Sequence, residues 1–258
     1  MPDSWMPTEA WNDMQTGNNP FAEYVRKPFQ EILVTERGYW LADLERSRVY
    51  MNRNQFAKGY CTLVARESVS TPHAMYLHQR RLFFDDMIRV GSALEKVFDT
   101  LTINYLIANN TVPHLHVQIV PRYHDDDLSL TAVDPDAQTQ HLDSEDDYQT
   151  HVADIREAMG FSREIITDPL LIKFMDEKAC IKDWPPLKHE DSQKAVRTYL
   201  ASKFEVGKKY TEKEVNALLN QWATFEDWAL LRCELFGAKY LNRMKDGSAY
   251  WVNEERES

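Results

Sequence analysis

Cysteine is scarce in this chain of 258 residues, which contains only three. Cys61, Cys180 and Cys233 lie far apart and form no C-x-x-C pair, which argues against a disulfide framework and against a cysteine zinc site. The start lacks a basic segment followed by an apolar run, and no stretch approaches the roughly 20 apolar residues that span a bilayer. We therefore expect a cytoplasmic protein without a membrane partner.

Positive charge is also in short supply, because 30 Lys and Arg residues face 41 Asp and Glu residues, for a net charge of -11. This total argues against a protein that coats nucleic acid or an anionic membrane. The charges are unevenly spread, however. Residues 1–122 carry 13 charges of each sign, whereas residues 123–182 carry 15 acidic and 5 basic ones. The charge therefore does not exclude a phosphate-binding pocket within the first of these segments.

The remaining composition, 43% apolar and 12% aromatic, is that of a globular chain with a sizeable core. Pro185 and Pro186 break any helix that enters from the preceding segment, so a domain boundary is expected nearby. The predicted organisation is an N-terminal arm (1–20), a first domain (21–161), a linker (162–182) and a C-terminal domain (183–258).

Patterns in the first domain predict an α+β fold. Short segments rich in Val, Leu, Tyr and Thr are typical of strands, and apolar residues spaced by three and four indicate a long amphipathic helix. There is no regular alternation of strand and helix, which favours an α+β sheet. The predicted strands are Arg48–Asn52, Tyr60–Arg66, Leu101–Ala108 and Leu115–Val120, the last ended by Pro121; the predicted helices are Tyr76–Phe98 and Glu145–Met159.

The C-terminal domain shows the order helix, helix, hairpin. Thr211 and Glu214 form a capping box at the start of a helix that runs to Trp222. A second helix is expected near 226–236, and the Asp246-Gly247 turn predicts a hairpin. This order is the outline of a winged helix-turn-helix, so we expect a small winged-helix-like domain.

The densest chemical signal is Pro113-His-Leu-His-Val-Gln-Ile-Val-Pro-Arg122. Residues two apart on a strand share a face, so His114, His116 and Gln118 project together while the apolar residues between them enter the core. Two histidines in this arrangement can bind a metal, can pack as satisfied polar groups, or can act as a nucleophile with its helper. No nearby spacing completes a metal site, and the spacing alone leaves the three alternatives open.

This motif, with the rest of Asn104–Arg122, resembles the histidine triad (HIT) superfamily of nucleotide hydrolases and nucleotidyl transferases. The resemblance covers about residues 38–160 and implies an antiparallel sheet, a homodimer and attack by the middle histidine, His116, on the α-phosphate of a nucleotide. It also implies that His114 helps to bind and orient the phosphate and the leaving group. A neutral imidazole can attack through one nitrogen when the other is held as a donor.

The sequence departs from the family at Gln118, where the third histidine would stand. Galactose-1-phosphate uridylyltransferases and dinucleoside polyphosphate phosphorylases also carry glutamine there, and they transfer nucleotides to phosphate-bearing acceptors. Glutamine can donate to a phosphoryl oxygen but cannot pass a proton near neutral pH. We therefore expect a nucleotide hydrolase, or a nucleotidyl transferase or phosphorylase, that cleaves a phosphoanhydride or phosphoramidate through a nucleotidyl-His116 intermediate. A slow hydrolase and a degenerate nucleotide-binding domain are the rival interpretations.

Amide and guanidinium side chains near the motif are candidates for nucleotide and phosphate contacts, because both groups donate to phosphate oxygens. No cofactor is required by the sequence, although a divalent metal can enter with the nucleotide. The candidate contacts are Asn104, Asn110, Asn52, Arg66 and Arg122.

The C-terminal domain, over residues 184–251, resembles a small uncharacterised bacterial domain, the domain of unknown function numbered 2087. The resemblance implies no established activity. A winged helix would place Arg232 on its second helix and Arg243 and Lys245 in its wing, where phosphate contacts can form. The alternative function is a nucleotide-sensing regulator whose C-terminal domain binds DNA or a protein partner. The blocks that carry the resemblance are Tyr210–Asn216, Leu231–Leu235 and Asp246–Trp251.

Overall fold

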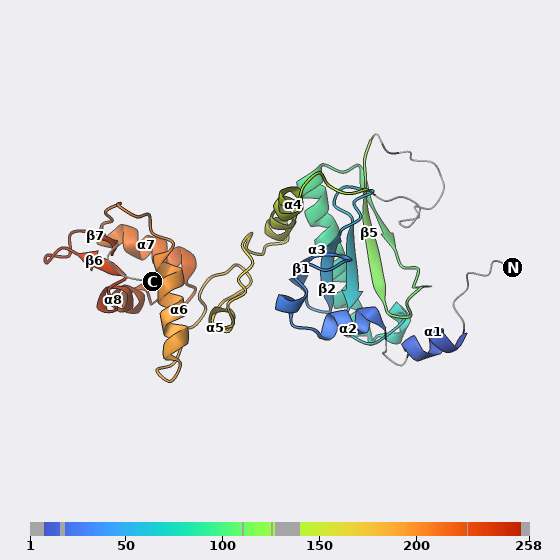
Figure 1. The fold of residues 1–258 in the computed structure, drawn as a ribbon, viewed down its shortest axis with the longest axis horizontal. Coiled ribbons are helices and arrows are strands. Elements are labelled where there is room, and N and C mark those ends of the chain that lie inside the picture. Colours follow the sequence, from blue (N-terminus) through green and yellow to red (C-terminus); the bar gives the residue numbers. More distant parts are fainter. Residues whose placement is uncertain are drawn as a thin grey trace. The chain divides into compact units, whose positions relative to one another are not determined.

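The computed structural model of the chain describes residues 8–15, 19–109, 111–124, 126, 140–225 and 227–253. The chain divides into two compact units, Met1–Arg163 and Glu164–Ser258, and each is described by itself (Figure 1). Within the described residues, no helix is both long and apolar enough to cross a membrane.

The first unit is built on a five-stranded sheet in which every neighbouring pair of strands is antiparallel. The order across the sheet is β1-β2-β3-β5-β4. The α+β fold with one long helix is therefore confirmed. The first strand was not predicted, because nearly all of its residues are buried and its sequence does not alternate. The strands are β1 (Gly38–Asp43), β2 (Ser47–Asn52), β3 (Cys61–Ala65), β4 (Thr102–Leu106) and β5 (His116–Arg122).

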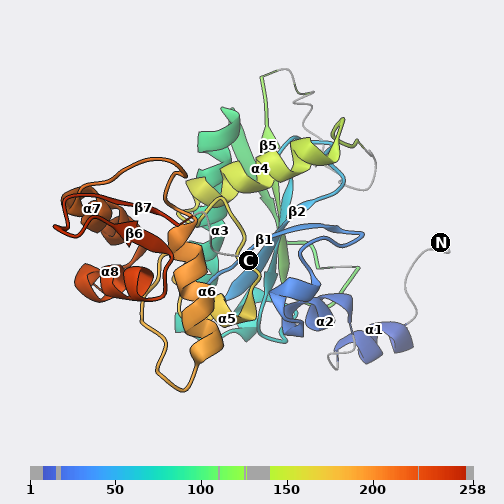
Figure 2. The same cartoon turned by 60° about the vertical axis from the view of Figure 1, so that its left-hand side comes forward.

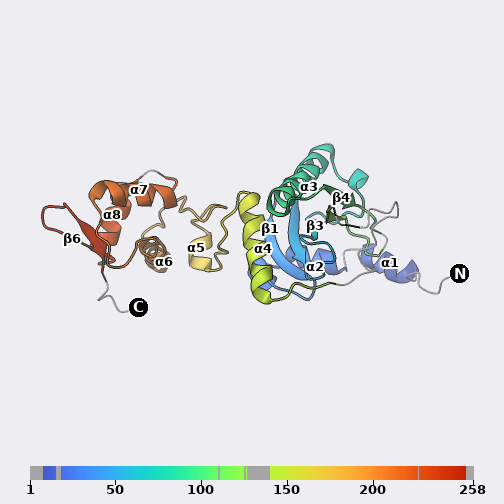
Figure 3. The ribbon, with the colours of Figure 1, turned by 90° about the horizontal axis from the view of Figure 1, so that it is seen from above.

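Alternation along β5 separates the two faces of the sheet. Val117 and its apolar neighbours on the strand are fully buried, and this face packs against α3 (Leu77–Phe98). His116 and Gln118 point to the opposite face, which α2 (Pro20–Arg26) covers. Figure 3 shows α3 and α2 on opposite sides of the sheet. The buried apolar residues that α3 contributes are Phe83, Val90, Ala93 and Leu94.

The strand β5 continues through Pro121, where the sequence predicted its end. β3 pairs with β5 only as far as Ile119, so at Pro121 the strand has a partner on one side only, Ile103 of β4. Proline lacks a backbone N–H and is tolerated where that group would face no neighbouring strand. The strand therefore ends one residue later, at Arg122.

Part of the predicted N-terminal arm is helical. It contains α1 (Thr8–Gln15), and Asn19 caps the start of α2 with its side chain. The other end of α2 is held by Arg48 of β2, which donates to the carbonyls of Tyr24 and Lys27 at 2.7 and 2.8 Å. The Asn19 bond stabilises the start of the helix, and the Arg48 bonds join its other end to the sheet.

A further helix, α4 (Glu145–Ala158), packs beside β1 and α3 (Figure 2). Near its C-terminus the buried Arg156 donates to the carbonyls of Leu41 and Ser162. Burial lowers the pKa of this guanidinium to about 10. The helix is thereby joined to the first strand by a buried polar contact as well as by packing.

The second unit is mainly helical, with one two-stranded hairpin. The predicted capping box of Thr211 and Glu214 begins α7. Tyr210 also forms a bridge with Tyr250 of the hairpin, which extends the small sheet by one residue pair. The elements are α5 (Pro169–Ile172), α6 (Glu190–Ala201), α7 (Glu212–Trp222), α8 (Trp228–Gly237), β6 (Leu241–Arg243) and β7 (Tyr250–Val252).

The structure differs from the prediction in residues 162–182, which were expected to form a linker. Leu171, Met175 and Ile181 are buried in the core of the second unit. Ile181 also donates to the carbonyl of Trp222, at the end of α7. Most of this segment is therefore part of the second unit, which begins at Glu164.

Candidate functional site

The candidate site lies along β5, on the face of the sheet that α2 covers. His116 lies opposite Val64 of β3, and Gln118 lies opposite Thr62. His114 precedes the strand by two residues, and only 1% of it is exposed. One aromatic ring of α2 packs against both imidazoles, so the two histidines share one enclosed surface.

The hydrogen bonding of His116 defines its tautomer. Its Nδ1 lies 2.7 Å from the carbonyl oxygen of His114. Because a carbonyl can only accept, Nδ1 carries the proton and Nε2 keeps its lone pair. Burial lowers the pKa of His116, the hydrogen bond to His114 opposes that change, and the charges of His114 and Arg37 lower the pKa further. A neutral imidazole with a free Nε2 is a nucleophile.

His114 is held in turn by the neighbouring strand. Its Nε2 donates to the carbonyl of Ala65, at the end of β3, over 2.7 Å. Its Nδ1 is buried and has no hydrogen-bond partner among the described residues. Burial lowers the pKa of His114, and the charge of Arg26 lowers it further. The His114 imidazole is therefore neutral. Its ring is hydrogen-bonded to β3 and its backbone carbonyl is hydrogen-bonded to the His116 imidazole, so His114 links the two.

Asn109 supports the same segment and was not predicted. Its Oδ1 accepts from the backbone N–H of His116 at 3.2 Å, and its Nδ2 donates to the carbonyl of Ser70 at 2.9 Å. Its φ of 51° lies in the left-handed region, which asparagine tolerates better than most residues. The doublet Asn109-Asn110 is the signal that the sequence offers for this position.

Phe21 and Arg37 complete the surroundings of His116, and neither was predicted. The ring of Phe21 lies 4.7 Å from the His116 imidazole and 6.3 Å from that of His114. The guanidinium carbon of Arg37 lies 5.3 Å from the centre of the Phe21 ring. Both residues precede the first strand, far along the chain from the motif, and no local pattern connects them with it.

Beside Gln118, polar side chains continue across the site face. Thr62 lies between Gln118 and Tyr50 in the cross-strand pairing. Asn52 donates to the Thr62 hydroxyl at 2.9 Å, so the structure brings this predicted residue into the same polar band. Burial raises the pKa of Tyr50, and hydrogen bonds with Thr62 and Arg37 oppose that rise.

The structure places two other predicted contacts away from His116. Arg122 donates to Asn104 at 3.0 Å and pairs with Asp126 at 2.7 Å. Arg122 lies six residues beyond His116 on the same strand, roughly 20 Å away at about 3.4 Å per residue. These residues form a separate cluster at the far end of β5.

The last two predicted contacts add little to the site. Arg66 is exposed just beyond the end of β3, next to the residue whose carbonyl holds His114. Asn110 lies outside the described residues. Among the residues that the structure describes, no three His, Cys, Asp or Glu side chains are grouped as ligands for a metal ion.

Comparisons with known proteins give a match for each unit. Residues 181–252 match a family described as an uncharacterized protein conserved in bacteria (DUF2087), in agreement with the predicted resemblance of the C-terminal domain. Solved structures similar to the first unit are histidine triad proteins. No curated protein matches the sequence.

Three of these solved structures illustrate the similarity. The histidine triad protein of Bradyrhizobium japonicum is 22% identical, with 48% of this chain and 92% of that chain covered and a TM-score of 0.44. That of Sinorhizobium meliloti is 19% identical, with 50% and 93% covered and a TM-score of 0.44. A zinc-bound histidine triad family protein of Mycobacterium smegmatis is 14% identical, with 51% and 91% covered and a TM-score of 0.39.

Proposed function

We propose that the first unit is an enzyme that cleaves a nucleotide phosphoanhydride, such as that of a dinucleoside polyphosphate, or a nucleoside phosphoramidate. The reaction passes through a nucleotidyl-His116 intermediate. The observation that carries this proposal is the hydrogen bond from His116 Nδ1 to the His114 carbonyl, which leaves Nε2 unprotonated.

In the first step, the Nε2 lone pair of His116 attacks the α-phosphorus. An N–P bond forms as the bond from phosphorus to the leaving group breaks, and the leaving group takes the bonding electron pair. A polyphosphate leaves as the anion, whereas the nitrogen of a phosphoramidate also takes a proton from solvent and leaves as the amine. The imidazole then carries a positive charge, which the His114 carbonyl stabilises through the Nδ1 hydrogen bond. In the second step an acceptor oxygen attacks phosphorus, the N–P bond breaks, and the neutral imidazole is restored.

His114 acts in this scheme as a positioning residue. Its Nε2 proton is already engaged by the carbonyl of Ala65. The ring therefore fixes the backbone of residue 114, and the carbonyl of that residue fixes His116. This role differs from direct phosphate binding, which the family resemblance implied for His114.

Gln118 determines which acceptor the second step uses. Its amide can donate to a phosphoryl oxygen, but it cannot remove a proton from water near neutral pH. An inorganic phosphate dianion needs no such base, because its oxygen already carries the charge. We therefore favour transfer to phosphate over hydrolysis, and a divalent metal that accompanies the nucleotide would neutralise part of the substrate charge.

A turnover assay tests the proposal. Diadenosine tetraphosphate and adenosine 5′-phosphoramidate are incubated with the full chain, each with and without inorganic phosphate. We expect cleavage of at least one substrate, a higher rate with phosphate, and complete loss in His116→Ala. The exposed His189→Ala serves as the matched control and should retain the wild-type rate. Cleavage that survives in His116→Ala would refute the covalent mechanism.

The second candidate function is a nucleotide-sensing regulator, and it depends on the second unit. The order of α6, α7, α8 and hairpin supports a winged-helix-like domain, with α8 as its second motif helix. The cation of that helix, Arg232, is engaged by Glu212 at 2.9 Å and by Asn216. This pairing favours a protein contact over DNA binding. Tight nucleotide binding without turnover in the assay above would favour the regulator.

A homodimer and a cytoplasmic location belong to the same proposal, because both come from the family resemblance and the sequence. Sedimentation of the full chain tests the first of these. A mass of twice 30.3 kDa is expected.

A further inference from the structure

Arg37 lies close to the candidate site, beside the aromatic ring that packs against His116. Its guanidinium carbon lies 5.3 Å from the centre of the Phe21 ring, and that ring lies 4.7 Å from the His116 imidazole, so the cation and the nucleophile contact the same aromatic ring. The charge of Arg37 also acts on the His116 imidazole and lowers its pKa. Arg37 also hydrogen-bonds with Tyr50 in the polar band beside Gln118. Arg37 therefore reaches the site from the residue just before β1.

The charge of Arg37 is not neutralised by any carboxylate that the structure describes. Arg48 pairs with Asp43, Arg46 pairs with Glu67, and Arg122 pairs with Asp126. Among the described residues, no carboxylate forms an ion pair with Arg37, and the residue is exposed. A guanidinium that no described carboxylate pairs with, and that shares the Phe21 ring with the nucleophile, is available for an anionic ligand, and its planar donors match phosphate oxygens.

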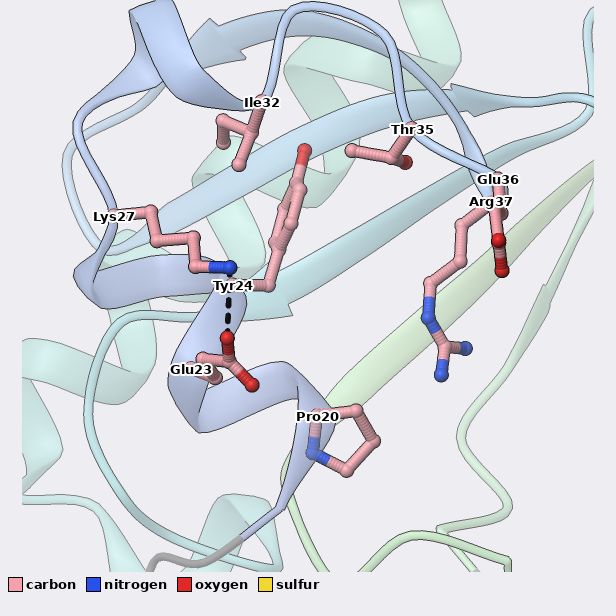
Figure 4. A pocket seen from close by; sticks show the side chains of 8 residues that line it. All are labelled: Pro20, Glu23, Tyr24, Lys27, Ile32, Thr35, Glu36 and Arg37. Atoms are coloured by element: carbon pink, nitrogen blue, oxygen red, sulfur yellow. Dashed lines mark ion pairs between the residues drawn. The ribbon is translucent and has the colours of Figure 1, made fainter.

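A cavity adjoins this cation. It has a volume of about 250 Å³ and lies between α2 and the segment that leads into β1. Figure 4 shows Arg37 and Lys27 on opposite sides of the cavity, with Tyr24 between them. Lys27 is paired with Glu23 at 2.7 Å, whereas Arg37 keeps its charge for a ligand. Space for a ligand and a cation without a described carboxylate partner therefore occur together at Arg37.

We propose that Arg37 binds the phosphoryl group that is transferred to His116, and that it supplies the permanent positive charge that Gln118 cannot carry. This inference rests on the proposed function and deepens it, because it makes the substrate's α-phosphate the specific ligand of Arg37. Negative charge spreads over the equatorial oxygens of phosphorus during transfer, and a guanidinium can hold two of them at once. The cavity next to Arg37 then receives the part of the nucleotide attached to that phosphate.

Equilibrium binding tests this inference without requiring turnover. Dissociation constants are measured for the four ribonucleoside 5′-monophosphates and for the four corresponding nucleosides, with wild type, Arg37→Met, Arg37→Lys and Arg81→Met. Wild type should bind at least one monophosphate at least about tenfold more tightly than its nucleoside, as expected of a charge-assisted contact. Arg37→Met should lose this preference, and Arg37→Lys should retain part of it.

Arg81→Met is the matched control, because Arg81 is an exposed arginine on α3, which covers the other face of the sheet. It should behave as wild type. A phosphate preference that persists in Arg37→Met overturns the inference, and so does a wild type that binds monophosphates no better than nucleosides. Arg37→Met should remain folded, with thermal unfolding lowered only by the loss of the hydrogen bond to Tyr50 and of the cation over Phe21, because the side chain itself is exposed.

The rate of label transfer to His116 separates this inference from the proposed function. With α-labelled diadenosine tetraphosphate, Arg37→Met should form the adduct at least about a hundredfold more slowly than wild type. If wild type and Arg37→Met form it equally fast, the inference fails while the covalent mechanism stands. If wild type forms no adduct but prefers monophosphates, and Arg37→Met loses that preference, the covalent mechanism fails while the inference stands.

Discussion

At the scale of single residues, the nucleophile is prepared by two successive hydrogen bonds that start in a different strand. The carbonyl of Ala65 holds the His114 ring, and the carbonyl of His114 holds the His116 ring. Each bond is 2.7 Å long and buried, so neither imidazole can change tautomer without leaving a buried polar group unpaired. The chemistry proposed for His116 therefore depends on the pairing of β3 with β5.

The two lowered histidine pKa values predict how stability depends on pH. Burial lowers the pKa of His114 and His116 below 6.5 in the folded state, so the unfolded chain binds protons more readily. Their contribution to stability is complete above the unfolded pKa and is lost as the pH falls through the lower folded values. The urea midpoint should thus be constant between about pH 7 and pH 8 and decrease below about pH 6.5.

His116→Gln provides the control for this pH dependence. The variant removes one of the two titrating groups, so its midpoint should decrease less steeply with falling pH than that of wild type. Identical slopes in the two proteins would contradict the assignment of a buried neutral imidazole at position 116.

Asn109 can be tested separately from the histidines. Asn109→Gly retains access to the left-handed φ but removes both side-chain hydrogen bonds, whereas Asn109→Ala also adds strain. We expect both variants to slow adduct formation about tenfold, since one hydrogen bond is worth about 1 kcal/mol. The free energy of unfolding of the alanine variant should be about 1 kcal/mol lower than that of the glycine variant. Wild-type rates in both would exclude a positioning role for Asn109.

The sequence and the structure agree best where the pattern is local. Alternation within residues 113–122 placed His116 and Gln118 on one face and Val117 in the core, and the register of β5 agrees. Phe21 and Arg37 could not be found in this way, because tertiary packing alone brings them to the motif.

At the scale of elements, α2 determines the environment of the site. Arg48 connects this helix to the sheet, because it donates to two carbonyls of the α2 region and pairs with Asp43 at 2.5 and 2.8 Å. Only 4% of the Arg48 side chain is exposed. Phe21 covers His116 only while this connection holds α2 in place.

Arg48→Met should break the connection. The substitution leaves Asp43 without its cation, and removal of one partner of a buried pair costs about 3 kcal/mol of unfolding free energy. Amide hydrogen exchange should accelerate in α2 more than in α3, which Arg48 does not contact. Lys27→Met removes only an exposed pair with Glu23 and should leave the exchange of α2 unchanged. Equal protection of α2 in wild type and Arg48→Met would contradict its anchoring role.

The boundaries of elements were less predictable than their existence. Pro121 indicated the end of a strand, but β3 begins only at Cys61, opposite Ile119, and leaves β5 unpaired on one side beyond that point, where proline fits. Whether proline fits within a strand depends on which strands pair with it, and a single sequence does not show that pairing.

At the scale of the whole molecule, the two units have separate cores, and the family match lies within the second of them. The expected linker is rich in apolar residues, but these follow no single period that would mark one long element. It could not be recognised as part of the second core, because the helices that bury Leu171, Met175 and Ile181 come later in the chain.

The second unit leads to a prediction about DNA. The exposed side chains of α8 include Trp228 and Phe236, and Arg232 is paired within the unit. Base recognition in the major groove uses donors and acceptors such as Arg, Asn and Gln. The full chain should therefore show no salt-dependent binding to duplex DNA in a fluorescence anisotropy titration. A logarithmic salt slope that corresponds to several phosphate contacts would contradict this expectation.

The central claim is that His116 Nε2 becomes covalently bonded to the α-phosphate of a nucleotide. The full chain is mixed rapidly with diadenosine tetraphosphate labelled at the α-phosphate, quenched in alkali, under which phosphohistidine bonds are expected to survive, and digested for mass spectrometry. The account predicts a labelled nucleotidyl group on the peptide that contains His116, and its absence in His116→Ala. Rapid cleavage of the substrate with no label on that peptide, or equal labelling of His116→Ala, would contradict it.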